Sequence, residues 1–490
     1  MMIRFIGPSK ALQHEMLGHM AGRHGLAEGF DYEFGDIENG TRSDCLNVLV
    51  GEEALARCCN VHGIDDYRGS IVSSTTGAKC IPIKYPSDAY YNGVQYAILD
   101  FDFARIVEEA RDLSFPNTPF EFTTGSDVSE LDIVLMEQAE YLACDIESVK
   151  ATSEIICVGF ASGPWKAISI FNNTPQGREW IQRLLRCNAR KIFHFGSFDT
   201  TMLELDGYDC TQYTDDTIIQ AHVLAPELPR DLGFLSSIYT KIPYFKSEGR
   251  TNIPGDAKAW SAKRDKTSLL VYNCKDCCAT YQIYQAQKVL IEENPNHLHI
   301  YNYEMEMVPV AREIGMNGML LDFDRNRLIK EHLETKKLKL TSAMSIICGG
   351  PINTASPKQM QAALYEGLGL PAKYKPASKK KKEEGIHSTL TTDNDALVSL
   401  VSAVKTQLNT LKTEKAKEPW KLRYHFITIA IQLRGLDKLI GSYIDITTHA
   451  GRIKSLYKVN GTETGRWSCA QFIDGSGLNA QTVPREELTV

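Results

Sequence analysis

The 490-residue sequence predicts an α/β protein built from several domains, and three observations support this prediction. The chain is too long for one ordinary core, because single hydrophobic cores stop growing at about 250–300 residues. Between residues 131 and 200, apolar runs rich in β-forming residues alternate with a helical pattern, as in a mixed α/β domain. From about Tyr301 onward, apolar residues recur at three- and four-residue intervals, which predicts a helical region.

The composition is that of an ordinary globular protein, with 43% hydrophobic and 23% charged residues. The N-terminus lacks the apolar segment of a secretory signal, and no stretch approaches the roughly 18 apolar residues of a membrane span. Thirteen cysteines, an odd number, favour reduced thiols over a disulfide framework. We therefore expect a cytoplasmic protein, in the host cytoplasm if it is viral, without a membrane partner.

Charge is distributed unevenly, although the net charge is only −7. Residues 372–490 contain 19 Lys and Arg against 12 Asp and Glu, whereas residues 1–371 contain 35 against 49. An acidic front joined to a basic back suits catalytic carboxylates followed by a phosphate-binding part. The same asymmetry is common in proteins that bind no nucleic acid, so charge alone does not decide the partner.

Local patterns predict the order of the elements. Pro116, Pro119 and the polar stretch 123–130 predict a linker. After it we expect three strands, a helix and a further strand, in the segments EYLACDIES, EIICVGFAS, KAISIF, REWIQRLLRC and KIFHF. Helices should fill most of residues 301–439 around a charged loop at 374–385, and the residues from Lys454 onward should form strands and loops.

Four carboxylates in this region form a candidate catalytic site. Asp145 and Glu147 stand two residues apart on a predicted strand, so both side chains project to one face, which is costly in a buried strand unless a cation binds. Asp199 follows the strand KIFHF, and Tyr272 and Asp276 share one face of a predicted helix. This set of oxygen ligands predicts a site for two divalent cations, Mg²⁺ or Mn²⁺, that hydrolyses phosphodiesters, with the Tyr272 hydroxyl orienting the attacking water.

Each of these patterns is weak by itself, since an Asp-x-Glu pair on a strand is structural in most proteins. Their combination in this order is what indicates one site. Cys274 and Cys277 form a Cys-x-x-Cys pair, but the sequence has no second pair with matching spacing, and the predicted helix already explains the segment. We therefore do not expect zinc.

Residues 131–292 resemble the DEDD superfamily of 3′→5′ exonucleases, in its tyrosine-containing branch. The resemblance rests on ACDIES, HFGSFD and YNCKD, which contain Asp145, Glu147, Asp199, Tyr272 and Asp276. It implies an RNase H-like fold in which the four acids bind two divalent cations and a single-stranded 3′ end of DNA is shortened. One departure is Phe195, where the family usually has asparagine; the change removes no metal ligand.

Residues 300–485 resemble the thumb and the start of the palm of family A DNA polymerases, especially those of bacteriophages. The segments that carry the resemblance are SPKQMQAALYEGLGLP, LRGLDKLIGSYID, TETGRWSC and LNAQTVPR. It implies a helical thumb at 300–450 and an incomplete palm at 451–490, which together bind primer–template DNA. The residues expected at that DNA are Lys379, Lys380, Lys381, Lys382, Arg434, Lys438, Thr462, Thr464, Gly465, Arg466, Ser468, Asn479 and Gln481.

These residues offer charges, hydroxyls, amides or a close backbone approach to phosphates. The lysine run would add salt-sensitive attraction to DNA, although such runs are often only solvated. An ordinary polar loop is the alternative interpretation of the tail.

The sequence stops before the palm aspartates that the resemblance would require for nucleotidyl transfer. We therefore expect the N-terminal proofreading part of a split or truncated polymerase, together with a second polypeptide that supplies the palm and fingers. Two alternatives stay open: a free-standing exonuclease of the same superfamily, and a non-catalytic scaffold that holds DNA for a partner.

Residues 1–118 resemble, over half a domain, uracil-DNA-glycosylase-like domains, in the stretches 46–72 and 78–91. Tyr85 stands where the active family has histidine, and the motif that activates water is missing. Because tyrosine cannot act as the imidazole does near neutral pH, we expect a degenerate domain that excises no uracil.

Overall fold

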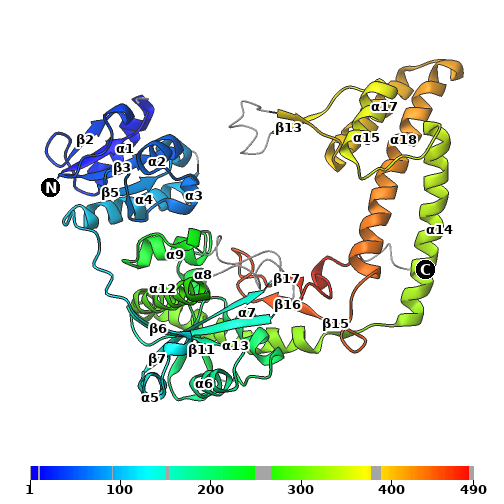
Figure 1. Cartoon of the computed structure of the whole chain (residues 1–490). Coiled ribbons are helices and arrows are strands. Elements are labelled where there is room, and N and C mark those ends of the chain that lie inside the picture. The colour runs from blue at the N-terminus through cyan, green and yellow to red at the C-terminus, as the bar shows by residue number, and fades with distance from the viewer. Residues whose placement is uncertain are drawn as a thin grey trace. The chain divides into compact units, whose positions relative to one another are not determined.

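The computed structural model describes residues 2–8, 11–90, 92–149, 154–210, 212–248, 266–376 and 388–484. The chain divides into two compact units (Figure 1). The first comprises Met1–Met316 with Leu456–Cys469, and the second comprises Asn317–Ser455 with Ala470–Val490. Within the described ranges, we find no helix that combines the length and the apolar character needed to cross a bilayer.

A five-stranded sheet forms the front part of the first unit, in the order β2-β1-β3-β5-β4. Its strands are β1 (Ile3–Ile6), β2 (Tyr32–Gly35), β3 (Leu46–Val50), β4 (Val72–Ser73) and β5 (Lys79–Ile83). All pairs are parallel except β4 with β5. β1, β3 and β5 are buried along their whole length, as expected when helices cover both faces of a parallel sheet.

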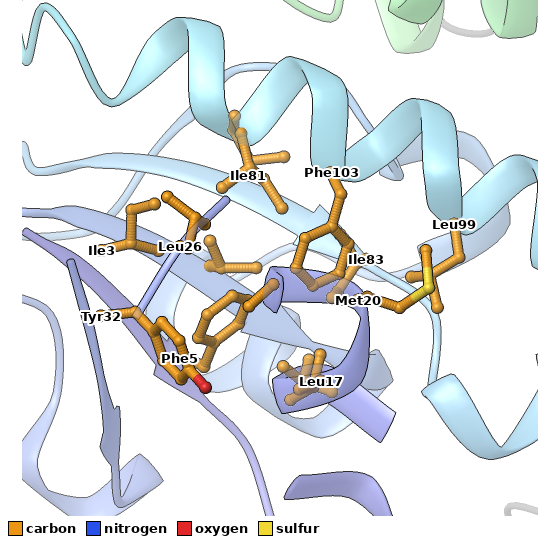
Figure 2. Packing of buried hydrophobic residues seen from close by; sticks show 14 of the residues in the cluster. Ile3, Phe5, Leu17, Met20, Leu26, Tyr32, Ile81, Ile83, Leu99 and Phe103 are labelled. Atoms are coloured by element: carbon orange, nitrogen blue, oxygen red, sulfur yellow. The ribbon is translucent and has the colours of Figure 1, made fainter. Parts of the chain in front are cut away.

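Helices pack on both faces of this front sheet. On one face, α1 (Ala11–Arg23) and α4 (Gly93–Glu109) enclose an apolar core in which the rings of Phe5 and Phe103 stack 5.7 Å apart (Figure 2). On the other face, α2 (Gly51–Cys59) and α3 (Ile64–Tyr67) form a second cluster with Ile6 and Leu49. Residues near the start of the chain therefore build a domain with its own core.

A six-stranded mixed sheet follows, in the order β11-β10-β7-β8-β9-β6. β7 (Tyr141–Val149), β8 (Glu154–Ala161) and β9 (Lys166–Phe171) are antiparallel neighbours, and β6 (Glu121–Thr124), β10 (Arg190–Phe193) and β11 (Tyr213–Asp216) each join in parallel. With α6 (Pro175–Arg186), the five elements expected after residue 131 are present in the expected order. The prediction of an α/β protein with several domains is thereby confirmed.

The prediction of a linker at 123–130 is wrong, because this stretch contains the end of a strand and the start of a helix. Thr123 and Thr124 belong to β6, which pairs with β9 as an edge strand. Ser129 begins α5 (Glu130–Glu137) in a capping box: its hydroxyl accepts from the backbone N–H of Asp132, whose carboxylate accepts from the backbone N–H of Ser129. The polar residues of this stretch serve an edge strand and a helix cap, both of which favour Ser, Thr and Asp and so imitate a linker.

The 27-residue helix α12 (Lys266–Glu292) packs across β7, β8 and β9 (Figure 1). It also packs against α8 (Thr217–Leu224) and α9 (Leu232–Tyr239). The first unit further contains α7 (Gly196–Leu205) and, up to Met316, α13 (Pro295–Asn317). Cys274 and Cys277 are buried in the core between α12 and the sheet. This helix positions the predicted Tyr272 and Asp276 against the strand that carries Asp145.

The C-terminal residues are divided between the two units at the hairpin of β16 (Ser455–Lys458) and β17 (Ser468–Gln471). Residues 456–469 group with the first unit, where Tyr457, Val459 and Trp467 pack against residues of α8 and α13. Residues 470–490 group with the second unit. The region 451–490, expected as one segment, is therefore divided.

The second unit is mostly helical, as predicted. Its described helices include α14 (Phe323–Cys348), α15 (Pro357–Gln361), the π-helical turn η4 (Ala362–Gly367), α17 (Asn394–Thr410), α18 (Glu414–Leu439) and the π-helical turn η5 (Ile440–Ile444). Two short antiparallel ladders pair β12 (Met319–Leu320) with β15 (Arg452–Ile453), and β13 (Tyr374–Pro376) with β14 (Ser388–Leu390). Gly318 adopts φ 59, and a Cβ there would lie 2.4 Å from the Ile453 carbonyl oxygen, so only glycine fits this turn.

Candidate active site

Three of the predicted carboxylates converge on the six-stranded sheet. Asp145 and Glu147 lie two residues apart on β7, opposite Gly159 and Cys157 of β8. Asp276 reaches them from α12, and one carboxylate oxygen of each residue lies within 4.8 Å of the others. Glu147 and Asp276 are buried, so water screens their charges poorly.

The fourth carboxylate is attached to the same strand. Asp199 stands in the first turn of α7, and its Oδ1 accepts a 3.2 Å hydrogen bond from the backbone N–H of Ile146, between the paired acids. Burial raises the pKa of Asp199 to about 8, although that hydrogen bond acts in the opposite direction. All four predicted acids are thus neighbours, with Asp199 outside the tightest group.

The carboxylates repel one another in a poorly hydrated place. Burial, followed by the charges of Asp276 and Glu147, raises the pKa of Asp145 well above its usual value. Burial, with Asp276 next, raises the pKa of Glu147 to about 8. A bound divalent cation would relieve this repulsion, and an all-oxygen ligand set suits a hard cation such as Mg²⁺ or Mn²⁺.

Tyr272 lies one helical turn before Asp276, as the sequence spacing predicted. Its hydroxyl lies near the Asp276 carboxylate and acts to lower the pKa of that carboxyl, against the larger effect of burial. Burial, with Asp276 next, raises the pKa of Tyr272, so the phenol stays neutral and keeps its proton as a donor.

Sequence analysis missed Lys246. Its Nζ donates to both oxygens of Asp276, at 2.7 and 2.9 Å, and lies 4.8 Å from the centroid of the Tyr272 ring. No motif surrounds Lys246, and it is 30 positions from Asp276 in the chain. A lysine in such a segment gives no local signal that could have identified it.

Asn273 was also missed, although it lies inside the segment YNCKD. Its Nδ2 donates to Oδ2 of Asp145 at 2.8 Å and to the Asp145 carbonyl oxygen at 3.2 Å, while its Oδ1 accepts from the Ser169 hydroxyl at 2.7 Å. Gly159 leaves space for this amide, because a Cβ at that position would lie 2.3 Å from Asn273 Oδ1. Its position next to Tyr272 was the signal that could have identified it.

Phe195 closes the turn from β10 into α7 at φ 64, a left-handed conformation that is uncommon for a bulky residue and commoner for asparagine. The Asp216 carboxylate accepts from the backbone N–H groups of Phe195 and Gly196, at 3.1 and 2.8 Å. Asp216 therefore holds the turn in place despite the absence of asparagine.

In the first unit, the predicted DNA-contacting residues cluster at the turn between β16 and β17. Thr464, Gly465 and Arg466 are exposed there, with Thr462 and Ser468 half-buried beside them. The Thr462 hydroxyl accepts from the backbone N–H of Arg466 at 3.0 Å and closes the turn. The Arg466 side chain is thus presented to solvent on a defined turn.

The remaining predicted contacts belong to the second unit. Arg434 donates from Nε to the Thr354 carbonyl oxygen at 2.7 Å and from Nη1 to that of Thr392, so its guanidinium holds two loops together. Lys438 is exposed on α18, and Gln481 is also exposed. Asn479 caps a short 3₁₀ turn by accepting from the Gln481 N–H at 3.1 Å. Lys379, Lys380, Lys381 and Lys382 lie outside the described residues.

These observations define a class of site: an acidic centre with hard oxygen ligands, on a mixed sheet and beneath a helix that supplies a neutral tyrosine.

Comparisons with known proteins indicate which proteins the chain is similar to. No family model matches it. Over 219 residues it is 28% identical to DNA polymerase I of Pseudomonas aeruginosa, covering 44% of this chain and 20% of that protein.

Two further relatives carry the same name. DNA polymerase I of Caldicellulosiruptor bescii is 25% identical over 309 residues, covering 62% of this chain and 30% of that protein. DNA polymerase I of Bacillus subtilis is 32% identical over 80 residues, covering 16% and 9% respectively. Among solved structures, the POL domain of Pol1 from M. smegmatis, in complex with DNA primer-template and dNTP, has a TM-score of 0.49 at 16% identity and covers 75% of this chain and 57% of that one.

The chain is therefore similar to part of bacterial DNA polymerase I, and the expected likeness to DNA polymerases is confirmed at that level. Its matches span only 20% and 30% of the length of the first two of these relatives. The phage type, the tyrosine-branch exonuclease and the glycosylase-like front domain stay predictions.

Proposed function

We propose that the first unit is a two-metal 3′→5′ exonuclease acting on DNA, and that the chain is the proofreading part of a family A polymerase. The observation that carries the proposal is the convergence of Asp145, Glu147 and Asp276 within 4.8 Å, beside Asp199. The similarity to bacterial DNA polymerase I supports DNA as the substrate.

The four carboxylates of Asp145, Glu147, Asp199 and Asp276 would hold two divalent cations. When bound, such cations supply the activation of water and the stabilisation of the leaving oxygen. The protein's own side chains orient the parts. Asn273 fixes the Asp145 carboxylate through Nδ2, and the neutral Tyr272 hydroxyl, which lies beside Asp276, would orient the attacking water.

We assign the exonuclease to residues 131–292, the thumb to 300–450 and the start of a palm to 451–490. Arg466, Thr464 and Lys438 are exposed, and we propose that they contact the phosphate backbone of DNA. Arg434 supports the second unit in this proposal, because its guanidinium is occupied by two carbonyl oxygens. A second polypeptide with palm and fingers stays a prediction, and so does a front domain at 1–118 descended from a glycosylase.

The test is digestion of a 5′-labelled single-stranded DNA with Mg²⁺ by the whole chain. We expect stepwise shortening from the 3′ end, abolished by EDTA and by the double substitution Asp145→Ala with Glu147→Ala. The matched control is Glu121→Ala, an exposed acid on β6 of the same sheet, which should digest DNA at the wild-type rate. Unchanged digestion by the double variant would show that the site is assigned to the wrong residues. A wild-type chain that binds DNA without digesting it would favour the alternative of a non-catalytic scaffold.

A further inference from the structure

The segment that leads to Lys246 is held by the front domain. Within the first unit, Arg68 donates to the Ser237 hydroxyl at 3.0 Å and lies 4.7 Å from the centroid of the Phe234 ring, both on α9. Arg68 is itself fixed, because it forms a buried ion pair with Asp102 of α4 at 2.6 Å. Helix α9 is therefore attached to the front domain through a buried, paired charge.

The contacts continue along the chain beyond α9. Arg105 of α4 donates to the Thr240 carbonyl oxygen at 2.6 Å, and Glu108 pairs with Lys241 at 3.4 Å. The rings of Tyr67 and Tyr244 lie 4.1 Å apart. Residues 240–245 form neither helix nor strand. Their path is set by these contacts together with Ile242 and Phe245, which are buried in the core beneath α12.

The next residues enter the candidate active site. The Phe245 ring lies 5.9 Å from the ring of Tyr272, and Lys246 follows with its two hydrogen bonds to Asp276. Glu248 pairs with Lys275 of α12 at 2.8 Å. Only Phe245 therefore separates Tyr244, which packs on Tyr67 of the front domain, from Lys246, whose ammonium group bonds a proposed metal-binding carboxylate.

We infer that Lys246 is a positioning residue of the exonuclease site and that the front domain, through Tyr67 and Tyr244, sets its position. For its effect on turnover this inference rests on the proposed function. Lys246 orients the Asp276 carboxylate by bonding both of its oxygens. Its ammonium group also packs over the Tyr272 ring, which limits the movement of that ring.

Charge balance indicates why a cation belongs there. Four carboxylates are neutralised by two divalent cations, and a bound phosphodiester then adds one negative charge. The Lys246 ammonium supplies the matching positive charge inside a poorly screened site. Lys246 thus serves the complex with DNA, and it bonds the same carboxylate that the cations would use.

The first experiment compares steady-state kinetics on single-stranded DNA. Lys246→Ala should lower kcat by about 10–100-fold, the usual effect of removing a group that orients a metal ligand, with KM little changed. Lys246→Arg keeps the charge and should recover most of the rate. Lys288→Ala is the matched control, because Lys288, on α12 with Asp276, donates to the Tyr141 hydroxyl and not to the carboxylates of the site. A wild-type kcat for Lys246→Ala overturns the inference.

The second experiment is a double-mutant cycle with the front domain. Tyr67→Ala should lower kcat in the wild-type background and have no further effect in the Lys246→Ala background, whereas Tyr67→Phe, which keeps the ring, should match the wild type. Equal losses in both backgrounds would show that Tyr67 acts by another route and would overturn the connection.

Mn²⁺ binding without DNA separates this inference from the proposed function. Removing or releasing the competing ammonium should tighten Mn²⁺ binding in Lys246→Ala and in Tyr67→Ala, with no additional change in the double variant. If the wild-type chain is inactive but the variants bind Mn²⁺ as expected, the exonuclease proposal is wrong and the positioning role of Lys246 is supported. Unchanged Mn²⁺ affinity in both single variants, with or without activity, overturns the positioning role.

Discussion

Replacing Asn273 by alanine is the sharpest test of how the site is assembled. The variant loses two hydrogen bonds to Asp145 and the one from the Ser169 hydroxyl, in a place where Asn273 is fully buried. Each buried polar group left without a partner costs about 1–3 kcal/mol, so the folded state should lose about 2–4 kcal/mol. The Asp145 carboxylate also becomes free to rotate, and kcat should fall by about 10–100-fold.

Chemical denaturation and exonuclease kinetics measure the two effects separately. Asn172→Ala is the matched control, because Asn172 is also buried at this sheet and donates to the Ile155 carbonyl oxygen at 3.2 Å and to Asp206 at 2.8 Å. It should lose comparable stability and keep the wild-type kcat when assayed well below its melting temperature. A wild-type kcat in folded Asn273→Ala would refute the view that this amide orients Asp145.

Three other predictions follow from the same geometry. Tyr272→Phe should lower kcat more than it weakens binding of single-stranded DNA, since the hydroxyl is proposed to act in the chemical step; normal single-turnover cleavage with lost binding would make Tyr272 a substrate clamp. In the absence of divalent cations, burial raises the pKa of Glu147 from 4.5 and of Asp199 from 3.8, each to about 8. Because the folded state holds these protons more tightly, the stability they contribute is fully present below about pH 4 and is lost as pH rises toward 8; Glu147→Gln should flatten that slope in thermal melts, and an unchanged slope would contradict the assignment. The whole chain should release no uracil from a uracil-containing duplex, because the tyrosine at position 85 cannot act as an imidazole does near neutral pH. The Tyr85 ring packs against Gly51, where a Cβ would lie 2.2 Å from the ring, and free uracil in the supernatant would disprove the prediction.

Local periodicity was enough to predict much of the candidate site. Asp145 and Glu147 share a face because side chains on a strand alternate, and Tyr272 and Asp276 share a face because residues four apart on a helix are neighbours. Both relations depend only on the element in which the residues lie. The sequence therefore indicated these pairs without any knowledge of what packs against them.

The linker prediction at 123–130 failed for the opposite reason. β6 is a strand because it pairs with β9, about 45 residues further along the chain, and its own polar residues carry no apolar alternation. Pairing between distant segments is a property of the sheet, and a short edge strand has little local preference of its own.

By itself, the sequence determined the class of fold, the four acids and the tyrosine, and the likeness to DNA polymerases. Only the tertiary structure decided that Asn273, itself held by Ser169, bonds Asp145, that Lys246 bonds Asp276, and that the front domain contacts the segment before Lys246. Ser169 and Asn273 are 104 positions apart in the chain, and Lys246 and Asp276 are 30 positions apart. Tyr67 and Tyr244 come from parts of the chain that fold around different cores. A side chain's local pattern records which face of its own element it occupies, whereas its partner is set by how separate elements pack, which no short stretch of sequence encodes.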